Sequence, residues 1–317
     1  MKKEITFIVN RSEITAGTRG ASLGPDAVIT AARVKNNSLF ADHPLIELPN
    51  YNDLLNRPIN TAFAKQIDGL IKVYTTVSES VSSELIKGNF PILLAGDHGS
   101  AGGTIAGIKK AFPTKRLGVI WIDAHGDLHT PFTTPSGNMH GMPLSTALND
   151  DNLECKINDV PSDTLAKWET LKNIGFSGAK IKPEDLVFIA VRDTEPEENA
   201  IIKRLGIKNY TVEEVIEKGT NSIVSLVLER LKECEILYIS FDVDSMDPKA
   251  TSYGTGTPVM NGLMPKQARE LLNGLGHSPK MICIEFVEVN PVLDEKMNRM
   301  AEVTFELIDS LVNTLKK

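Results

Sequence analysis

The stretch Leu117-Gly-Val-Ile-Trp-Ile-Asp123-Ala-His-Gly-Asp127 joins an apolar run to a cluster of polar side chains. The run is short, nearly continuous and rich in β-branched residues, which is typical of a strand covered on both faces. Asp123, His125 and Asp127 follow at intervals of two, and side chains at that spacing point the same way in extended backbone. The stretch therefore predicts a buried strand of an α/β fold that ends in three converging ligand-type side chains.

Two further apolar runs end in similar residues. Pro91-Ile-Leu-Leu-Ala-Gly-Asp-His98 ends in a histidine, and Leu237-Tyr-Ile-Ser-Phe-Asp242-Val-Asp244 ends in two aspartates spaced two apart. Asp and His also occur in loops merely to satisfy backbone groups. Sites in open α/β sheets, however, form beyond the carboxyl ends of the strands. We therefore expect the three polar clusters to face one another at one edge of a sheet.

Together these clusters provide two imidazoles and four carboxylates, which are more ligands than one small cation needs. Closely packed carboxylates repel one another and resist ionising together, so they call for a compensating charge. Two neighbouring divalent cations would provide it, in the arrangement usual for hydrolytic metal centres. Because the set contains no thiolate, it favours a harder ion such as Mn²⁺, with Fe, Co, Ni and Zn left open.

The length and the alternation of elements predict the broad architecture. A chain of 317 residues is compatible with one α/β domain covering residues 1–317. Alternating strand and helix signals fit either a doubly wound sheet or an eight-stranded barrel, and periodicity does not decide between them. We expect helices at 61–87, 221–232, 265–275 and 294–317, and a surface loop within 150–185.

Composition excludes several classes of partner. The formal net charge is −7 without a basic cluster, so there is no electrostatic footprint for nucleic acid. No stretch approaches the roughly 20 apolar residues of a membrane span, and no signal peptide is recognisable. Three scattered cysteines are too few for a disulfide framework. We expect a soluble, cytoplasmic protein without nucleic-acid or membrane partners.

Several motifs resemble those of one enzyme family. Gly-Asp-His98, Asp123-Ala-His-Gly-Asp127 and Ser240-Phe-Asp-Val-Asp-x-x-Asp-Pro248 resemble the three signatures of the ureohydrolases, and Ser136-Gly-Asn-Met-His140-Gly resembles the arginase branch. The similarity runs from about Gly17 through Pro291. It implies a three-layer α/β/α fold with an open, parallel, doubly wound sheet of about eight strands. It also implies two Mn²⁺ per subunit and a homo-oligomer, either a trimer or a hexamer.

The resemblance also assigns the metal ligands. One metal would be held by His98, Asp123, Asp127 and Asp242, and the other by His125, Asp123, Asp242 and Asp244. A metal-bridging hydroxide would then attack the guanidinium carbon of L-arginine, and the products would be L-ornithine and urea.

Catalytic roles follow from the same resemblance. His140 would deliver the proton that the departing amine needs, since imidazole changes charge near neutral pH. Glu288 would bind the guanidinium group, which stays cationic and suits a carboxylate. Asp127 would serve in catalysis as well as in metal binding. An alternative for Glu288 is a carboxylate held by the backbone at a strand end.

The residues expected to choose the substrate depart from the family pattern at two positions. Thr134, Ser136 and Asn138 match the donors for an α-carboxylate. His129 stands where arginases usually have Asn, and Glu195 stands where they usually have Asp, with Glu198 beyond it. The acidic run 192–198 also fits the first turn of a helix, where carboxylates favour the macrodipole.

Because of these departures, other functions stay open beside arginine hydrolysis. The chain could be an agmatinase or another guanidino-acid hydrolase, a catalytically silent partner subunit or binding protein, or a deacetylase of related fold. The four aspartates exceed what the single zinc ion of such a deacetylase requires.

Overall fold

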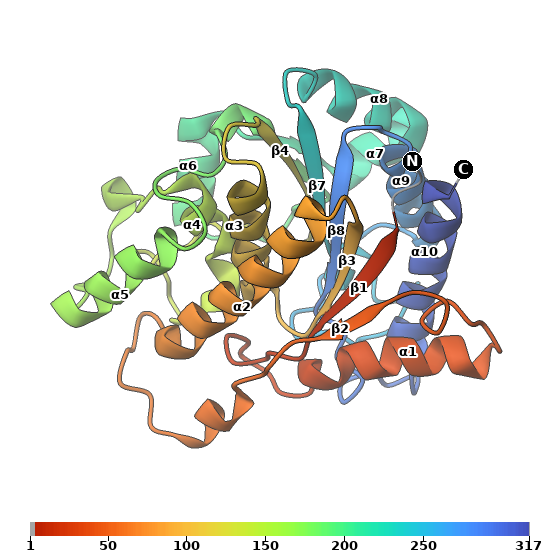
Figure 1. Ribbon diagram of the computed structural model, residues 1–317. Helices are drawn as coiled ribbons and strands as arrows, with labels where there is room; N and C mark the ends of the chain where they lie inside the picture. Colours follow the sequence, from red (N-terminus) through yellow and green to blue (C-terminus); the bar gives the residue numbers. More distant parts are fainter. Residues whose placement is uncertain (1–3, 317) are drawn as a thin grey trace.

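The computed structural model describes residues 4–316, which form one sheet of eight parallel strands between two layers of helices (Figure 1). The strand order is β2-β1-β3-β8-β7-β4-β5-β6, so the sheet is open and doubly wound rather than closed into a barrel. The predicted three-layer α/β/α fold is confirmed. The strands are β1 (Ile5–Asn10), β2 (Leu45–Glu47), β3 (Phe90–Ala95), β4 (Leu117–Ile122), β5 (Leu186–Ile189), β6 (Lys208–Tyr210), β7 (Ile236–Asp242) and β8 (Met281–Val287).

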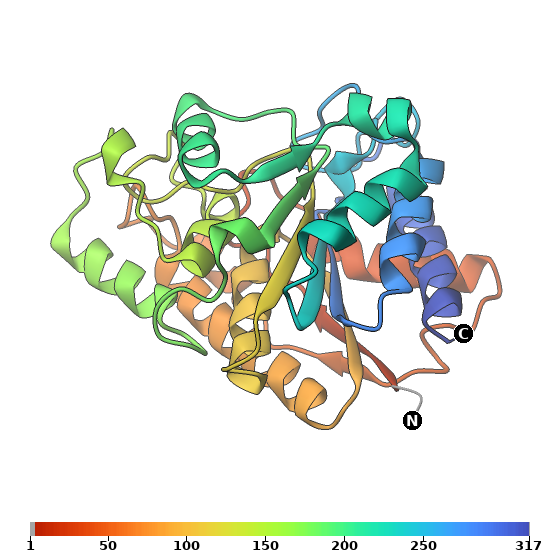
Figure 2. The same ribbon diagram turned by 90° about the horizontal axis from the view of Figure 1, so that it is seen from above.

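The helices divide between the two faces of the sheet. One face is covered by α2 (Ile67–Ile86), α3 (Ala101–Ala111), α4 (Pro143–Leu148), α5 (Ser162–Lys172) and α6 (Pro196–Leu205). The other is covered by α1 (Gly24–Val34), α7 (Val212–Lys218), α8 (Thr220–Arg230), α9 (Pro265–Gly276) and α10 (Arg299–Leu315). Figure 2 shows α2 and α3, in orange to yellow, across the sheet from α9 and α10, in blue. The central strands are buried on both faces, which explains their nearly continuous apolar sequences.

A glycine-rich turn after β3 lets two helices approach closely. A Cβ atom built on Gly102, in α3, would lie 1.9 Å from the hydroxyl of Tyr74, in α2. Only glycine fits there without displacing the tyrosine ring. The glycines at the start of α3 thus let this helix pack closely against α2.

The structure corrects the starts of two predicted helices and adds a helix within the segment that was expected to contain a surface loop. The helix predicted at 61–87 begins only at Ile67, because Gln66 has a left-handed backbone with φ of 61°. The last helix begins at Arg299 rather than near residue 294, after Met297 with φ of 70°. The additional helix, α5, lies within the polar segment 150–185. Its sequence is mostly polar, but its Trp168 is fully buried. Between residues 4 and 316, no helix has the length and apolar character needed to cross a bilayer.

Candidate active site

The polar clusters lie at the carboxyl ends of neighbouring central strands. His98 follows β3, Asp123 follows β4, and Asp242 is the last residue of β7. Glu288 follows β8, which lies between β3 and β7 in the sheet. Parallel strands present their carboxyl ends at one edge, so residues separated by up to 190 positions meet there.

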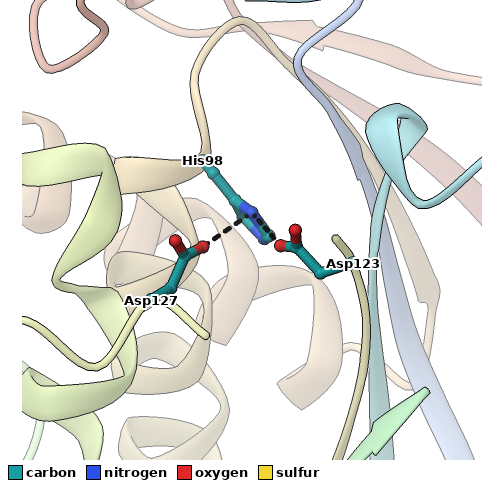
Figure 3. Close-up of side chains that lie close together, drawn as sticks. All are labelled: His98, Asp123 and Asp127. Carbon is teal, nitrogen blue, oxygen red and sulfur yellow. Dashed lines mark ion pairs between the residues drawn. The ribbon is translucent and has the colours of Figure 1, made fainter. Parts of the chain in front are cut away.

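His98 lies at the centre of a first group of buried carboxylates (Figure 3). Its Nδ1 atom is 3.0 Å from Asp123 Oδ2, 3.0 Å from Asp127 Oδ2 and 3.2 Å from Asp242 Oδ2. Among residues 4–316, neither His98 Nδ1 nor Asp123 Oδ2 has a hydrogen-bond partner, although both are buried. Buried polar atoms without partners are costly, and lone pairs that converge in this way fit a cation.

A second group shares one carboxylate with the first. His125 Nδ1 lies 3.1 Å from Asp244 Oδ2 and 3.5 Å from Asp123 Oδ1. Asp123 thus directs one oxygen at each imidazole, as a carboxylate between two metal ions would. The geometry of this donor set fits two adjacent cations.

Backbone amides fix the orientation of three of these carboxylates. One oxygen of Asp123 accepts from the N–H of His125 at 2.7 Å, and one oxygen of Asp242 accepts from the N–H of Asp244 at 2.9 Å. One oxygen of Asp244 accepts from the N–H of Ala124 at 3.1 Å. These bonds hold each carboxylate in place and leave its second oxygen near the imidazoles.

The electrostatics of the site also call for positive charge. Burial, reinforced by the charges of Asp244 and Asp123, raises the pKa of Asp242 well above its ordinary value. Burial opposes the protonation of His98, but its carboxylate neighbours outweigh burial and raise the imidazole pKa. Divalent cations held among these carboxylates would supply that positive charge.

Two residues outside the predicted set position His98. Its Nε2 atom lies 2.8 Å from Ser240 Oγ, and its ring stacks on Trp121 with 4.1 Å between centroids and 5° between planes. Ser240 belongs to the third sequence motif and Trp121 to the opening stretch. The sequence alone does not show that either residue contacts His98.

The route by which the ligands converge differs from the prediction. β4 ends at Ile122, and Asp127 has a left-handed backbone with φ of 50°. The three side chains after β4 therefore meet through a bend rather than through extended backbone. Glu288 is likewise left-handed, with φ of 66°. Such conformations cost about 1–3 kcal/mol each in non-glycine residues and often mark functional sites.

A cavity of about 310 Å³ opens above these groups. Asp123 is fully buried beneath it, whereas the other predicted site residues line it. Four further lining residues were not among the predicted site residues: Pro135, Gly141, Asp193 and Thr257. The first three lie within two positions of predicted site residues, so their place in the chain was the signal that could have found them.

His140 and Glu288 form a pair next to the two histidine–aspartate groups. His140 Nδ1 lies 3.4 Å from Glu288 Oε1, which also accepts from the backbone N–H of His98 at 2.8 Å. Burial opposes protonation of His140, but Glu288 outweighs it and raises the imidazole pKa. The other Glu288 oxygen has no such backbone partner and remains available to a cationic ligand.

His129 and Glu195, the two residues that depart from the family pattern, lie together in the same cavity. His129 Nε2 is 3.1 Å from Glu195 Oε2 and 3.7 Å from Glu198 Oε2. Glu198 also accepts from the N–H of Glu195 at 3.2 Å, at the start of α6. The acidic run therefore both begins a helix and lines the cavity, so the two interpretations of its sequence are compatible.

Comparison with known proteins identifies the family of the chain. The arginase family profile matches residues 4–313. The chain belongs to the arginase family. Arginase from Bacillus caldovelox is 35% identical, with 98% of each chain covered.

Solved arginase-family structures share the fold. The crystal structure of Bacillus subtilis arginase has a TM-score of 0.80 at 32% identity, with 98% of both chains covered. Entamoeba histolytica arginase, solved in complex with L-ornithine, has a TM-score of 0.82 at 26% identity and covers 98% of this chain and 99% of its own.

Proposed function

We propose that this arginase-family enzyme hydrolyses the guanidinium group of L-arginine to L-ornithine and urea. The observation that carries the proposal is the placement of the paired histidine–aspartate groups directly beside His140 and Glu288, within one cavity. Matches to arginases over nearly the whole chain support the choice of arginine.

Two divalent cations, with Mn²⁺ as the expected ion, would be held by the six residues around Asp123. The ligands would be His98, Asp123, Asp127 and Asp242 on one side, and His125, Asp123, Asp242 and Asp244 on the other. When bound, such a pair supplies Lewis acidity and lowers the pKa of water, which provides a nucleophile near neutral pH. Asp127 would also act in catalysis.

The remaining chemistry would be performed by the side chains of Glu288 and His140. Glu288 would bind the planar, cationic guanidinium group and hold its carbon over the nucleophile. His140 would donate a proton to the departing nitrogen, because an alkylamide anion is too basic to leave. The protonated form that this step requires is favoured by the raised pKa of His140.

Recognition of the amino-acid end would fall to the outer part of the cavity. Thr134, Ser136 and Asn138 would donate hydrogen bonds to the α-carboxylate. Glu195 and Glu198, with His129 between them, would face the α-ammonium group. We further propose that the enzyme is a cytoplasmic homo-oligomer, either a trimer or a hexamer, with two metal ions per subunit.

Parallel urea assays test this function. Metal-stripped protein reloaded with Mn²⁺ is expected to release urea from L-arginine in preference to agmatine or 4-guanidinobutyrate. Urea from agmatine or 4-guanidinobutyrate but not from arginine would instead identify another guanidino hydrolase. Failure to release urea from all three, despite bound metal, would favour a silent partner subunit.

A further inference from the structure

Lys65 reaches the rim of the cavity from the loop 61–66 that precedes α2. Its ammonium group donates to Asn138 Oδ1 at 3.2 Å, and its backbone N–H donates to Gly137 O at 2.8 Å. A Cβ atom on Gly137, where φ is 76°, would lie 1.9 Å from Ala62 O. The loop carrying Lys65 and the loop carrying Asn138 are therefore in direct contact, which fixes the lysine against the rim.

Lys65 places a positive charge next to a cavity that is lined by carboxylates. The described residues that line the cavity include several carboxylates but neither Lys nor Arg. Lys65 is half-buried, and within residues 4–316 no carboxylate forms an ion pair with it. An ammonium group has three donors, and here a single amide oxygen satisfies one of them. Lys65 is not itself a lining residue, so its positive charge acts on the cavity from behind Asn138.

The same contact orients the Asn138 amide. Because lysine can only donate, the Asn138 oxygen must face Lys65 and the amide nitrogen must point elsewhere. In the described part of the chain, that nitrogen donates to no protein acceptor. The contact with Lys65 thus leaves the amide nitrogen of Asn138, a residue that lines the cavity, free to donate to a ligand.

The opposite charge lies elsewhere in the cavity. Glu195 and Glu198 provide carboxylates beside His129, whereas Lys65 stands behind Asn138. A ligand that carries both a carboxylate and an ammonium group would be complementary to these two charges. A ligand that lacks the carboxylate would leave the Lys65 charge and the Asn138 donor unpaired, and unpaired polar groups are what give such sites their selectivity.

We propose that Lys65 is a specificity-determining residue, which selects guanidino substrates that carry a carboxylate at the end remote from the guanidinium group. This inference rests on the proposed hydrolysis of guanidino compounds and specifies how the site distinguishes among them. Lys65 acts by its charge and by holding Asn138, and it has no part in the bond-breaking step.

The test compares Lys65→Met and Lys65→Arg in the Mn²⁺-loaded enzyme. With Lys65→Met, kcat/KM for L-arginine and 4-guanidinobutyrate should fall about tenfold, mainly through KM, since charged hydrogen bonds contribute more than neutral ones. Agmatine has no carboxylate, so its kcat/KM should stay within about twofold. Lys65→Arg should recover most of the loss. Lys110→Met, at an exposed position of α3, is the matched control.

An equal loss for all three substrates, or no loss for those with a carboxylate, would overturn the proposal. Thermal unfolding of Lys65→Met identifies a variant that merely fails to fold, and Lys65→Gln, which also removes the charge, then carries the comparison. Calorimetric binding of L-ornithine and putrescine separates this inference from the proposed function. If the wild-type chain releases no urea, weaker binding of ornithine alone to Lys65→Met would still support the role of Lys65, whereas equal effects on both ligands would contradict it.

Discussion

Ser240 Oγ lies 2.8 Å from Nε2 of His98, the ring nitrogen that does not face Asp123. Ser240 lies in β7 and His98 follows β3, with β8 between these two strands. Hydrogen bonds of this kind set the tautomer and the ring plane of a metal-binding histidine. We therefore expect Ser240 to affect metal affinity through His98.

Ser240→Ala should weaken metal binding without removing a ligand. Loss of such an outer contact typically lowers metal affinity by about 10- to 100-fold. Competition between the protein and a chelator for Mn²⁺ measures the change, and circular dichroism checks the fold. An unchanged Mn²⁺ affinity would show that Trp121 stacking alone is enough to position His98.

Removal of individual histidines should separate the two cation positions. His98→Ala and His125→Ala should each reduce the bound metal by about one equivalent per chain, because each imidazole belongs to a different group of carboxylates. Elemental analysis of dialysed protein gives the stoichiometry. If both variants keep the full wild-type content, these histidines are not ligands.

Metal removal should lower the stability of the fold as well as abolish activity. Bound Mn²⁺ would neutralise buried carboxylates in the native state, so each site held at about 100 times its Kd should add about 2.7 kcal/mol to the free energy of unfolding. Thermal unfolding with and without excess chelator measures this effect. A melting temperature that does not respond to Mn²⁺ would argue against the proposed metal centre.

His140→Ala should retain both metal ions yet lower kcat by about 10²- to 10⁴-fold, the usual contribution of a general acid. KM should change little, because the proton is needed only as the amine departs. His277→Ala provides a control at an exposed histidine outside the site. A wild-type kcat for His140→Ala would remove His140 from the mechanism.

His129→Asn should lower KM for L-arginine about three- to tenfold. The His129 imidazole lies 3.1 Å from Glu195 and contacts the carboxylate that we expect to face the substrate ammonium group. 4-Guanidinobutyrate lacks that group, so its KM should change less. A rise in KM for arginine would mean that His129 itself binds the substrate.

Much of the fold could be predicted from the order of apolar runs. Buried parallel strands need side chains that are apolar on both faces, and the runs ending at His98, Asp123 and Asp242 meet that need. Helix boundaries were harder to predict. Periodicity continues through residues 61–66, but a left-handed Gln66 separates that loop from α2.

The sequence by itself determined which side chains follow each strand, because local apolar patterns and short motifs are properties of neighbouring residues. Only the tertiary structure decided how those side chains meet, since strand order sets which loops become neighbours. The bend at Asp127, the Ser240 contact with His98 and the approach of Lys65 to Asn138 all depend on distances between segments far apart in the chain. No local pattern carries those distances, because packing of the whole sheet and its helices sets them.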